Sequence, residues 1–165
     1  MTTRHSILWG QANGRLKIES LVDASRVKGI CVIRGGNREA FLATKGFENL
    51  VPVEAPGQCL NMLLAGRIEL IFMSSLEVAS LATMHNTSKT KLVPLYKVFS
   101  NKSYIAMSKN GTSAQTVKQW QDTTQAMKDD GTFSRIANKW SDYILKHYAM
   151  PTYVKNNVLI FEQKR

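Results

Sequence analysis

The sequence predicts an α/β fold, in which a parallel or mixed sheet is flanked by helices. Short apolar, often β-branched runs alternate with helix-like stretches along most of the chain, and glycine, proline or serine separates one from the next. The composition agrees with this. The 165 residues are 44% hydrophobic and 21% charged, which is typical of a globular chain that can bury a core.

The first half of the chain shows the alternation most clearly. Ile30–Ile33 is a continuous apolar run that predicts a buried strand, and Gly35-Gly36 interrupt it. Asn37 is then expected to cap a helix that Gly46 ends. The other elements expected here are strands at Ser6–Gly10, Leu50–Val53 and Glu69–Met73, and helices over Ser20–Arg26, from Pro56 to Gly66, and from Ser74-Ser75 to about Met84.

The second half changes in character. It predicts strands at Val93–Phe99 and Tyr104–Met107, amphipathic helices over Ser113–Lys128 and Phe133–Lys146, and a last strand over Tyr153–Glu162. The helices carry aromatic side chains at three-to-four spacing, which we interpret as packing residues. They are Trp120, Phe133, Trp140 and Tyr143.

Charge and hydropathy exclude several classes of partner. The net charge is +10, but the basic residues are scattered and do not interleave with aromatic ones, so no nucleic-acid partner is expected. No apolar run reaches the ~18 residues that a membrane span needs. The residues after Met1 lack the pattern of a signal peptide.

Cysteine and histidine show no pattern of a metal site. Cys31 and Cys59 have no metal-ligand spacing, and we expect two small core residues. The three histidines are far apart and share no motif, so neither a metal nor a cofactor is expected.

The first candidate binding segment is the turn Arg34-Gly35-Gly36-Asn37-Arg38, between a predicted strand and a predicted helix. Glycines let a ligand approach the backbone, and a helix start offers free N–H groups with a partial positive charge. Asn37 can add a hydrogen bond, and Arg34 or Arg38 can pair with a carboxylate or phosphate. The alternative is an ordinary tight turn with two solvated arginines.

The second candidate is Ser74-Ser75, which ends another predicted strand before another helix. Ligands of open α/β sheets lie outside the carboxyl ends of the strands, so these hydroxyls could contact one. Plain helix capping is the alternative. The carboxylates are isolated, and no Gly-x-Ser-x-Gly, HExxH or CxxC motif is present, so no catalytic residue is expected and the chain is not predicted to be an enzyme.

Several segments together resemble one family of proteins. They are Val32–Leu42, Gly46–Leu50, Leu63–Leu70, Tyr104–Lys109 and Trp120–Trp140, which lie within about residues 5 to 146. In order and spacing they are similar to the extracellular solute-binding proteins of family 3, the amino-acid-type receptors of ABC importers. The resemblance implies a type II periplasmic-binding-protein-like fold, with two α/β lobes joined by hinge strands around a ligand cleft.

The resemblance implies three parts of the chain. Residues 1–17 form a hinge strand and connection, and residues 18–95 form a full second lobe. Residues 96–165 form the return hinge and the terminal helices of an incomplete first lobe. The chain therefore resembles a truncated receptor that binds weakly alone. Gly35–Arg38 match the turn that contacts the ligand's carboxylate. Ser74 stands where these receptors usually carry an acidic residue for the ligand's ammonium group.

The resemblance implies capture of a small polar solute, amino-acid-like or anionic. It further implies a periplasmic location and the membrane subunits of an ABC importer as partners. Apolar helix faces without a packing partner could also lead to self-association. The alternative function is the cytosolic effector-binding domain of a transcription regulator, which shares the two-lobe architecture.

Overall fold

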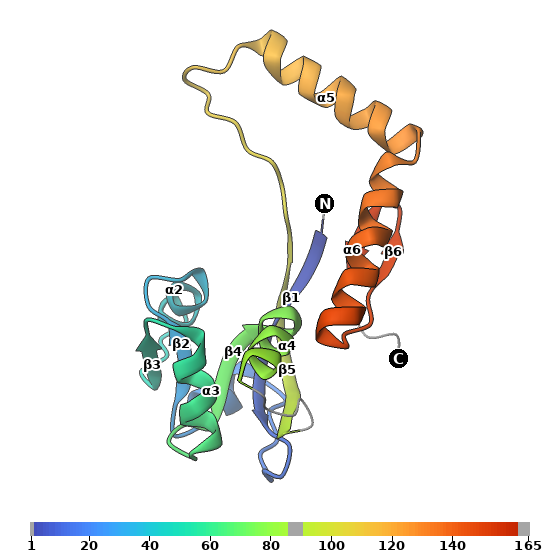
Figure 1. Cartoon of the computed structure of the whole chain (residues 1–165). Helices are drawn as coiled ribbons and strands as arrows, with labels where there is room; N and C mark the ends of the chain where they lie inside the picture. The colour runs from blue at the N-terminus through green and yellow to red at the C-terminus, as the bar shows by residue number, and fades with distance from the viewer. Residues whose placement is uncertain (1, 86–90, 162–165) are drawn as a thin grey trace. The chain divides into compact units, whose positions relative to one another are not determined.

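The computed structural model describes residues 2–85 and 91–161. Within them the chain forms two compact units (Figure 1). The first, here called the sheet unit, consists of the described residues of His5–Ser100, and the rest of the described residues form the second, here called the helical unit. Strands β1 (Thr2–Gln11) and β5 (Leu92–Lys102) each contribute residues to both units.

The sheet unit contains a mixed sheet. Its strands run in the order β3 (Leu50–Val53), β2 (Ile30–Ile33), β4 (Leu70–Ser74) and β1, and β5 also pairs with β1. Strand β2 is parallel to both β3 and β4, whereas β4 and β1 are antiparallel. The parallel part arises because a helix follows each of β2, β3 and β4, as the alternation in the sequence predicts.

Helix boundaries in the sheet unit follow the expected capping residues, with one correction. Ser20 caps α1 (Leu21–Ser25) and Ser74 caps α4 (Ser75–Met84), each through its side chain, and Pro56 begins α3 (Pro56–Leu64). The prediction that Asn37 caps α2 (Asn37–Thr44) is wrong. Gly36 is the N-cap, because Gly35 reverses the chain at φ 68° and lets the helix begin at Asn37 itself.

The core of the sheet unit lies in two clusters. Successive residues of β4 belong to different clusters. Phe72 packs with Leu8, Val32 and Leu42. Met73 packs in the other cluster, which includes residues of α3. Since successive side chains of a strand point to opposite faces, the two clusters occupy the two faces of the sheet. Burial on both faces explains why β2 and β4 read as continuous apolar runs.

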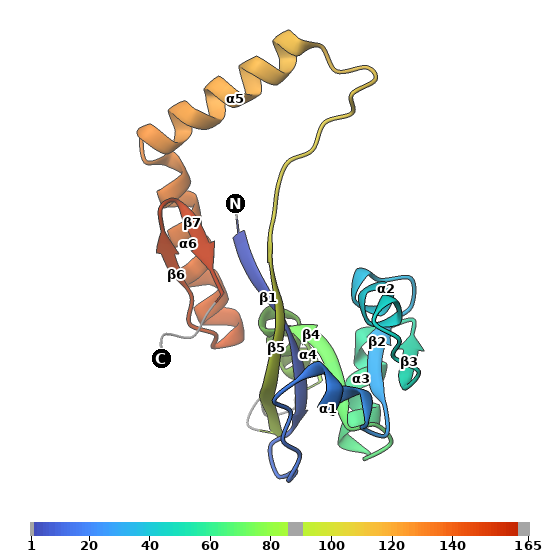
Figure 2. The ribbon, with the colours of Figure 1, turned by 180° about the vertical axis from the view of Figure 1, so that it is seen from behind.

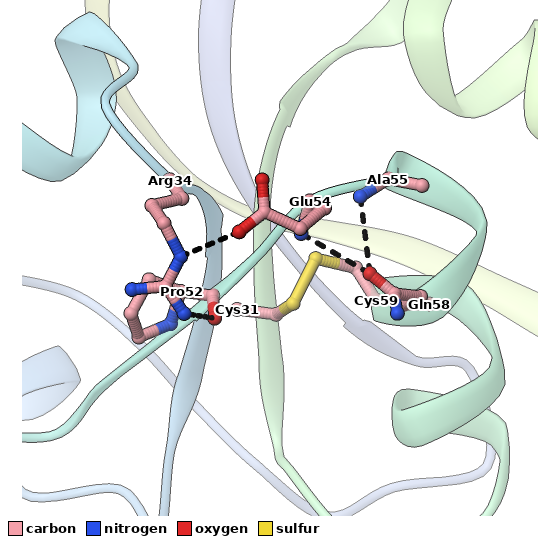
Figure 3. Close-up of a disulfide and its surroundings, with 7 residues drawn as sticks. All are labelled: Cys31, Arg34, Pro52, Glu54, Ala55, Gln58 and Cys59. Atoms are coloured by element: carbon pink, nitrogen blue, oxygen red, sulfur yellow. Dashed lines mark hydrogen bonds and ion pairs between the residues drawn. A yellow bond between two sulfur atoms is a disulfide. The ribbon is translucent and has the colours of Figure 1, made fainter.

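Cys31 and Cys59 are joined by a disulfide (Figure 3). Both are fully buried, which agrees with the expectation of core residues, but that expectation did not include their pairing. The bond links β2 to α3, with 5.5 Å between the Cα atoms. The 28 residues of separation gave no sign of this pairing, because only the packing of α3 against the sheet brings the two side chains together.

The helical unit contains α5 (Ala114–Asp129), α6 (Thr132–Tyr148) and a hairpin of β6 (Tyr153–Lys155) and β7 (Val158–Ile160) (Figure 2). The hairpin replaces the single strand predicted up to Glu162, which itself lies outside the described residues. It turns at Asn156-Asn157, both with positive φ, as a type I′ turn requires. Strand β7 pairs in parallel with the start of β1.

Two further expectations about this unit are wrong. Tyr104–Met107 forms no strand, and Tyr104 and Ile105 are largely exposed, because β5 continues past Phe99, the predicted end of the preceding strand, to Lys102 and the chain then leaves the sheet. The helix aromatics are also poor packing residues. Trp120 is 52% exposed and Trp140 51% exposed, and Tyr143 is exposed as well, whereas Phe133 is half-buried. No helix of the described residues is both long and apolar enough to cross a bilayer.

Candidate functional site

Two strand–helix turns meet at one edge of the sheet. Strands β2 and β4 are parallel neighbours, with Ile30 opposite Leu70 and Cys31 opposite Ile71, so their carboxyl ends lie at the same edge. Helix α2 follows β2 and α4 follows β4, which places two helix N-termini there. Each N-terminus offers unpaired N–H groups and a partial positive charge of about half a unit.

The turn after β2 depends on its two glycines. Gly35 has φ 68°, in the left-handed region that glycine adopts without strain. A Cβ atom on Gly36 would lie 2.9 Å from the carbonyl oxygen of Ile33, which accepts the Gly36 N–H at 3.0 Å. Gly36 supplies no side-chain cap, so the first N–H groups of α2 are not met by the cap residue. Asn37 is exposed beside them.

Arg34 is directed toward Pro52 of β3 and toward Glu54, which follows that strand (Figure 3). Its Nε donates to Glu54 at 2.7 Å, and its Nη2 donates to the carbonyl oxygen of Pro52 at 3.2 Å. Both members of this ion pair are well exposed, so it contributes little to stability. Arg34 is therefore an exposed arginine paired with the next turn, and its contact with a ligand stays a prediction.

Arg38 connects the two turns. Its guanidinium group donates two hydrogen bonds to Glu77 of α4, from Nη1 at 3.0 Å and from Nη2 at 2.7 Å. Its Nε donates to the Ser6 hydroxyl of β1 at 3.2 Å, and its Cζ lies 5.9 Å from the centre of the Phe72 ring of β4. The Arg38 side chain is only 19% exposed, so these contacts hold it in one position.

Ser74 completes the network from the end of β4. Its hydroxyl donates to Glu77 Oε2 at 2.6 Å, and its backbone N–H donates to the same oxygen at 2.7 Å. In return the hydroxyl accepts the Glu77 N–H at 3.3 Å, which is the reciprocal arrangement of a capping box. Ser74 is therefore buried and committed to capping, while Ser75 stays half-exposed at the first position of α4.

Glu77 is ionised at neutral pH. Burial acts to raise its pKa, but hydrogen bonds from Arg38 and from the Ser74 hydroxyl and N–H outweigh it. The pKa therefore lies below its ordinary value of 4.5. The edge thus carries a fixed pair of opposite charges between two helix N-termini.

Two residues of this network, Ser6 and Glu77, were not predicted from the sequence. Glu77 was one of the carboxylates judged isolated, although Ser74-Ser75-Leu76-Glu77 has the spacing of a capping box, which places the carboxylate beside Ser74. Ser6 gave no signal, because only the antiparallel register of β1 and β4 puts it opposite Ser74. Within the described residues, no group of histidine, cysteine and carboxylate side chains could hold a metal ion.

Searches by sequence found no match, either among protein-family models or among curated proteins. Solved structures do match. A histidine kinase sensor domain with similarity to periplasmic binding proteins aligns with a TM-score of 0.69 at 18% identity, over 84% of this chain and 59% of that one. A mutant of the arginine-binding protein ArgBP from T. maritima aligns with a TM-score of 0.63 at 14% identity, over 89% and 58%.

The L-cystine solute receptor of Neisseria gonorrhoeae aligns with a TM-score of 0.55 at 16% identity, over 89% of this chain and 57% of the receptor. The chain has a periplasmic-binding-protein-like α/β fold. This confirms the predicted fold class. The chain spans less than 60% of the length of these three structures. The gonococcal protein among them is a receptor for the solute L-cystine.

Proposed function

We propose that the chain is a solute-binding module that takes a small polar molecule at the carboxyl edge of β2 and β4. The observation that carries this proposal is the Arg38–Glu77 ion pair, which joins the turn after β2 to the start of α4. It holds two helix N-termini at one edge, and ligands of open α/β sheets bind outside this edge. The periplasmic-binding-protein-like fold of solute receptors supports the same reading.

The solute's acidic group would bind at the start of α2. The N–H groups of Asn37 and Arg38 belong to the first helical turn, which has no side-chain cap, and a Cβ at Gly35 would meet nothing within 4 Å, so there is open space beside this turn. Ser75 would contact the solute from α4. Arg34 and Ser74, the other predicted site residues, would act indirectly, since the first pairs with Glu54 and the second with Glu77. Contacts from a single edge predict weak, millimolar binding.

The broader role that we propose is that of a family 3 receptor serving an ABC importer outside the cytoplasm. The Cys31–Cys59 disulfide supports this location, because disulfides persist in oxidising compartments and are rare in the cytosol. Transporter membrane subunits would then be the partners.

A sensory role is the second candidate. It is favoured by the histidine kinase sensor domain among the matching structures, in which the same kind of fold belongs to a signalling protein. The cytosolic effector-binding domain of a regulator is a variant of this idea, but the disulfide argues against it.

The test compares two variants that add the same negative charge. Asn37→Asp places a carboxylate at the first position of α2, where it favours the helix and repels an incoming carboxylate. Asn138→Asp makes the same change on an exposed site of α6 and is the control. In calorimetric or NMR titrations with a panel of L-amino acids, we expect Asn37→Asp to lose binding and Asn138→Asp to retain it. Equal affinities in the two variants would contradict the proposal.

A further inference from the structure

Five hydrogen-bond donors at the carboxyl edge are already met by the protein's own carboxylates. Glu77 accepts hydrogen bonds from both terminal nitrogens of Arg38 and from the N–H and hydroxyl of Ser74. Glu39 accepts the N–H of Gly35 at 2.5 Å. An anionic solute that approached Arg38 would therefore have to displace Glu77 from both terminal nitrogens of the guanidinium group, while Ser74 holds the carboxylate in place.

Charges at this edge are close to balance. Two arginines, Arg34 and Arg38, face three carboxylates, which are Glu39, Glu54 and Glu77. Arg34 pairs with Glu54 and Arg38 pairs with Glu77, which leaves Glu39 at the start of α2 to oppose the partial positive charge of that helix N-terminus. The edge would thus exert no net attraction on an anion. A zwitterion can place its carboxylate at a helix start and still add no net charge to the edge.

We infer that Glu77 sets the charge specificity of the site: by neutralising Arg38 it makes the edge accept solutes without net charge, such as amino acids with neutral side chains, and discriminate against anions. This rests on the proposed function and narrows its solute class. Glu77 acts as a positioning and specificity residue through Arg38. Without it, Arg38 would present an uncompensated positive charge beside the start of α2.

Glu77→Gln is a suitable perturbation because glutamine also serves at this position of a capping box, so the N-terminus of α4 keeps its cap. The matched control is Glu54→Gln. It frees Arg34, an arginine of the same turn, and changes the net charge equally, but its ion pair is exposed and lies toward α3. The probes are L-glutamine and L-glutamate, which have nearly the same shape and differ by one charge.

The ratio of glutamate affinity to glutamine affinity is measured by NMR titration of the full chain. In Glu77→Gln we expect this ratio to rise roughly tenfold, which equals about 1.4 kcal/mol. In Glu54→Gln it should stay within about twofold of wild type, since exposed charges are screened. An unchanged ratio in Glu77→Gln, or an equal rise in both variants, would overturn the inference.

A double variant, Arg38→Gln with Glu77→Gln, serves as a second test in case Glu77→Gln alone fails to fold, because it leaves no unpaired charge in the network. It removes both charges of the pair, so the ratio should return to the wild-type value, and a raised ratio would count against Arg38 as the anion partner. The two proposals fail separately. If wild type binds neither amino acid, the proposed function fails, whereas if it binds glutamine and the variants leave the ratio unchanged, only the charge inference fails.

Discussion

Reduction of the Cys31–Cys59 disulfide should destabilise the sheet unit substantially. The bond closes a loop with a sequence separation of 28 residues, for which loss of chain entropy in the unfolded state gives about 3.6 kcal/mol at 25 °C. Both cysteines are fully buried, so neither is accessible to reductant in the folded state. Against a typical total of about 5–15 kcal/mol, this is a large share of the stability.

The sheet unit can be observed by itself through Trp9. Of the 3 tryptophans, Trp120 and Trp140 belong to the helical unit, so replacing both with phenylalanine leaves Trp9 as the fluorescent reporter. The Trp9 indole donates to the carbonyl oxygen of Met73 in the cluster that contains the disulfide. With a urea m-value of about 2 kcal/mol/M, reduction should lower the unfolding midpoint by about 1.8 M.

Two results would refute this reasoning. One is an equal urea midpoint with and without reductant. The other is quantitative alkylation of both cysteines in denaturant without reductant, which would mean that the disulfide does not form. A Cys31→Ala, Cys59→Ala variant should match the reduced protein, apart from any cost of the cavity left behind.

Three further predictions concern named side chains. The pKa of Glu77 is lowered in the folded state, so the stability that this carboxylate contributes is present above its ordinary pKa of 4.5 and is lost as the pH falls through the folded pKa. The melting temperature of Glu77→Gln should therefore depend less on pH below about 4.5 than that of wild type. Gly35→Ala should cost about 1 kcal/mol in urea unfolding, since alanine is strained at φ 68° although its Cβ meets nothing within 4 Å, and a neutral result would contradict the turn geometry. Trp120→Gln and Trp140→Gln should each change the unfolding free energy by less than about 0.5 kcal/mol and lower the binding of a hydrophobic dye, and larger losses of stability would show that these side chains are packed.

Most elements of the sheet unit could be predicted because their signals are local. Strand β3 has its predicted bounds of Leu50–Val53, and α3 and α4 begin at Pro56 and Ser75 as capping chemistry indicates. Predictions failed where a local pattern has more than one outcome. An apolar segment such as Tyr104–Met107 becomes a strand only if a neighbouring strand is free to pair with it.

The candidate site was only partly foreseeable. Helix starts at strand ends can be recognised from sequence, so the positions of Gly35, Gly36 and Ser74 at strand–helix turns could be predicted. The partners of their neighbours depend on tertiary structure. Arg34 pairs with Glu54 because β3 lies beside β2, and Arg38 pairs with Glu77 because β4 lies on its other side. No sequence spacing distinguishes these two arginines, although one is solvated and the other is held in the network.

The most direct test of the central claim is to locate a bound solute on the isotopically labelled chain by NMR. A neutral L-amino acid is titrated to millimolar concentration while the backbone amide signals are followed. The largest shifts should fall on Gly35–Arg38 and on Ser74–Glu77, and they should saturate together with one dissociation constant. Shifts concentrated on α5 and α6, or no saturable shift with any amino acid, would contradict binding at the carboxyl edge of β2 and β4.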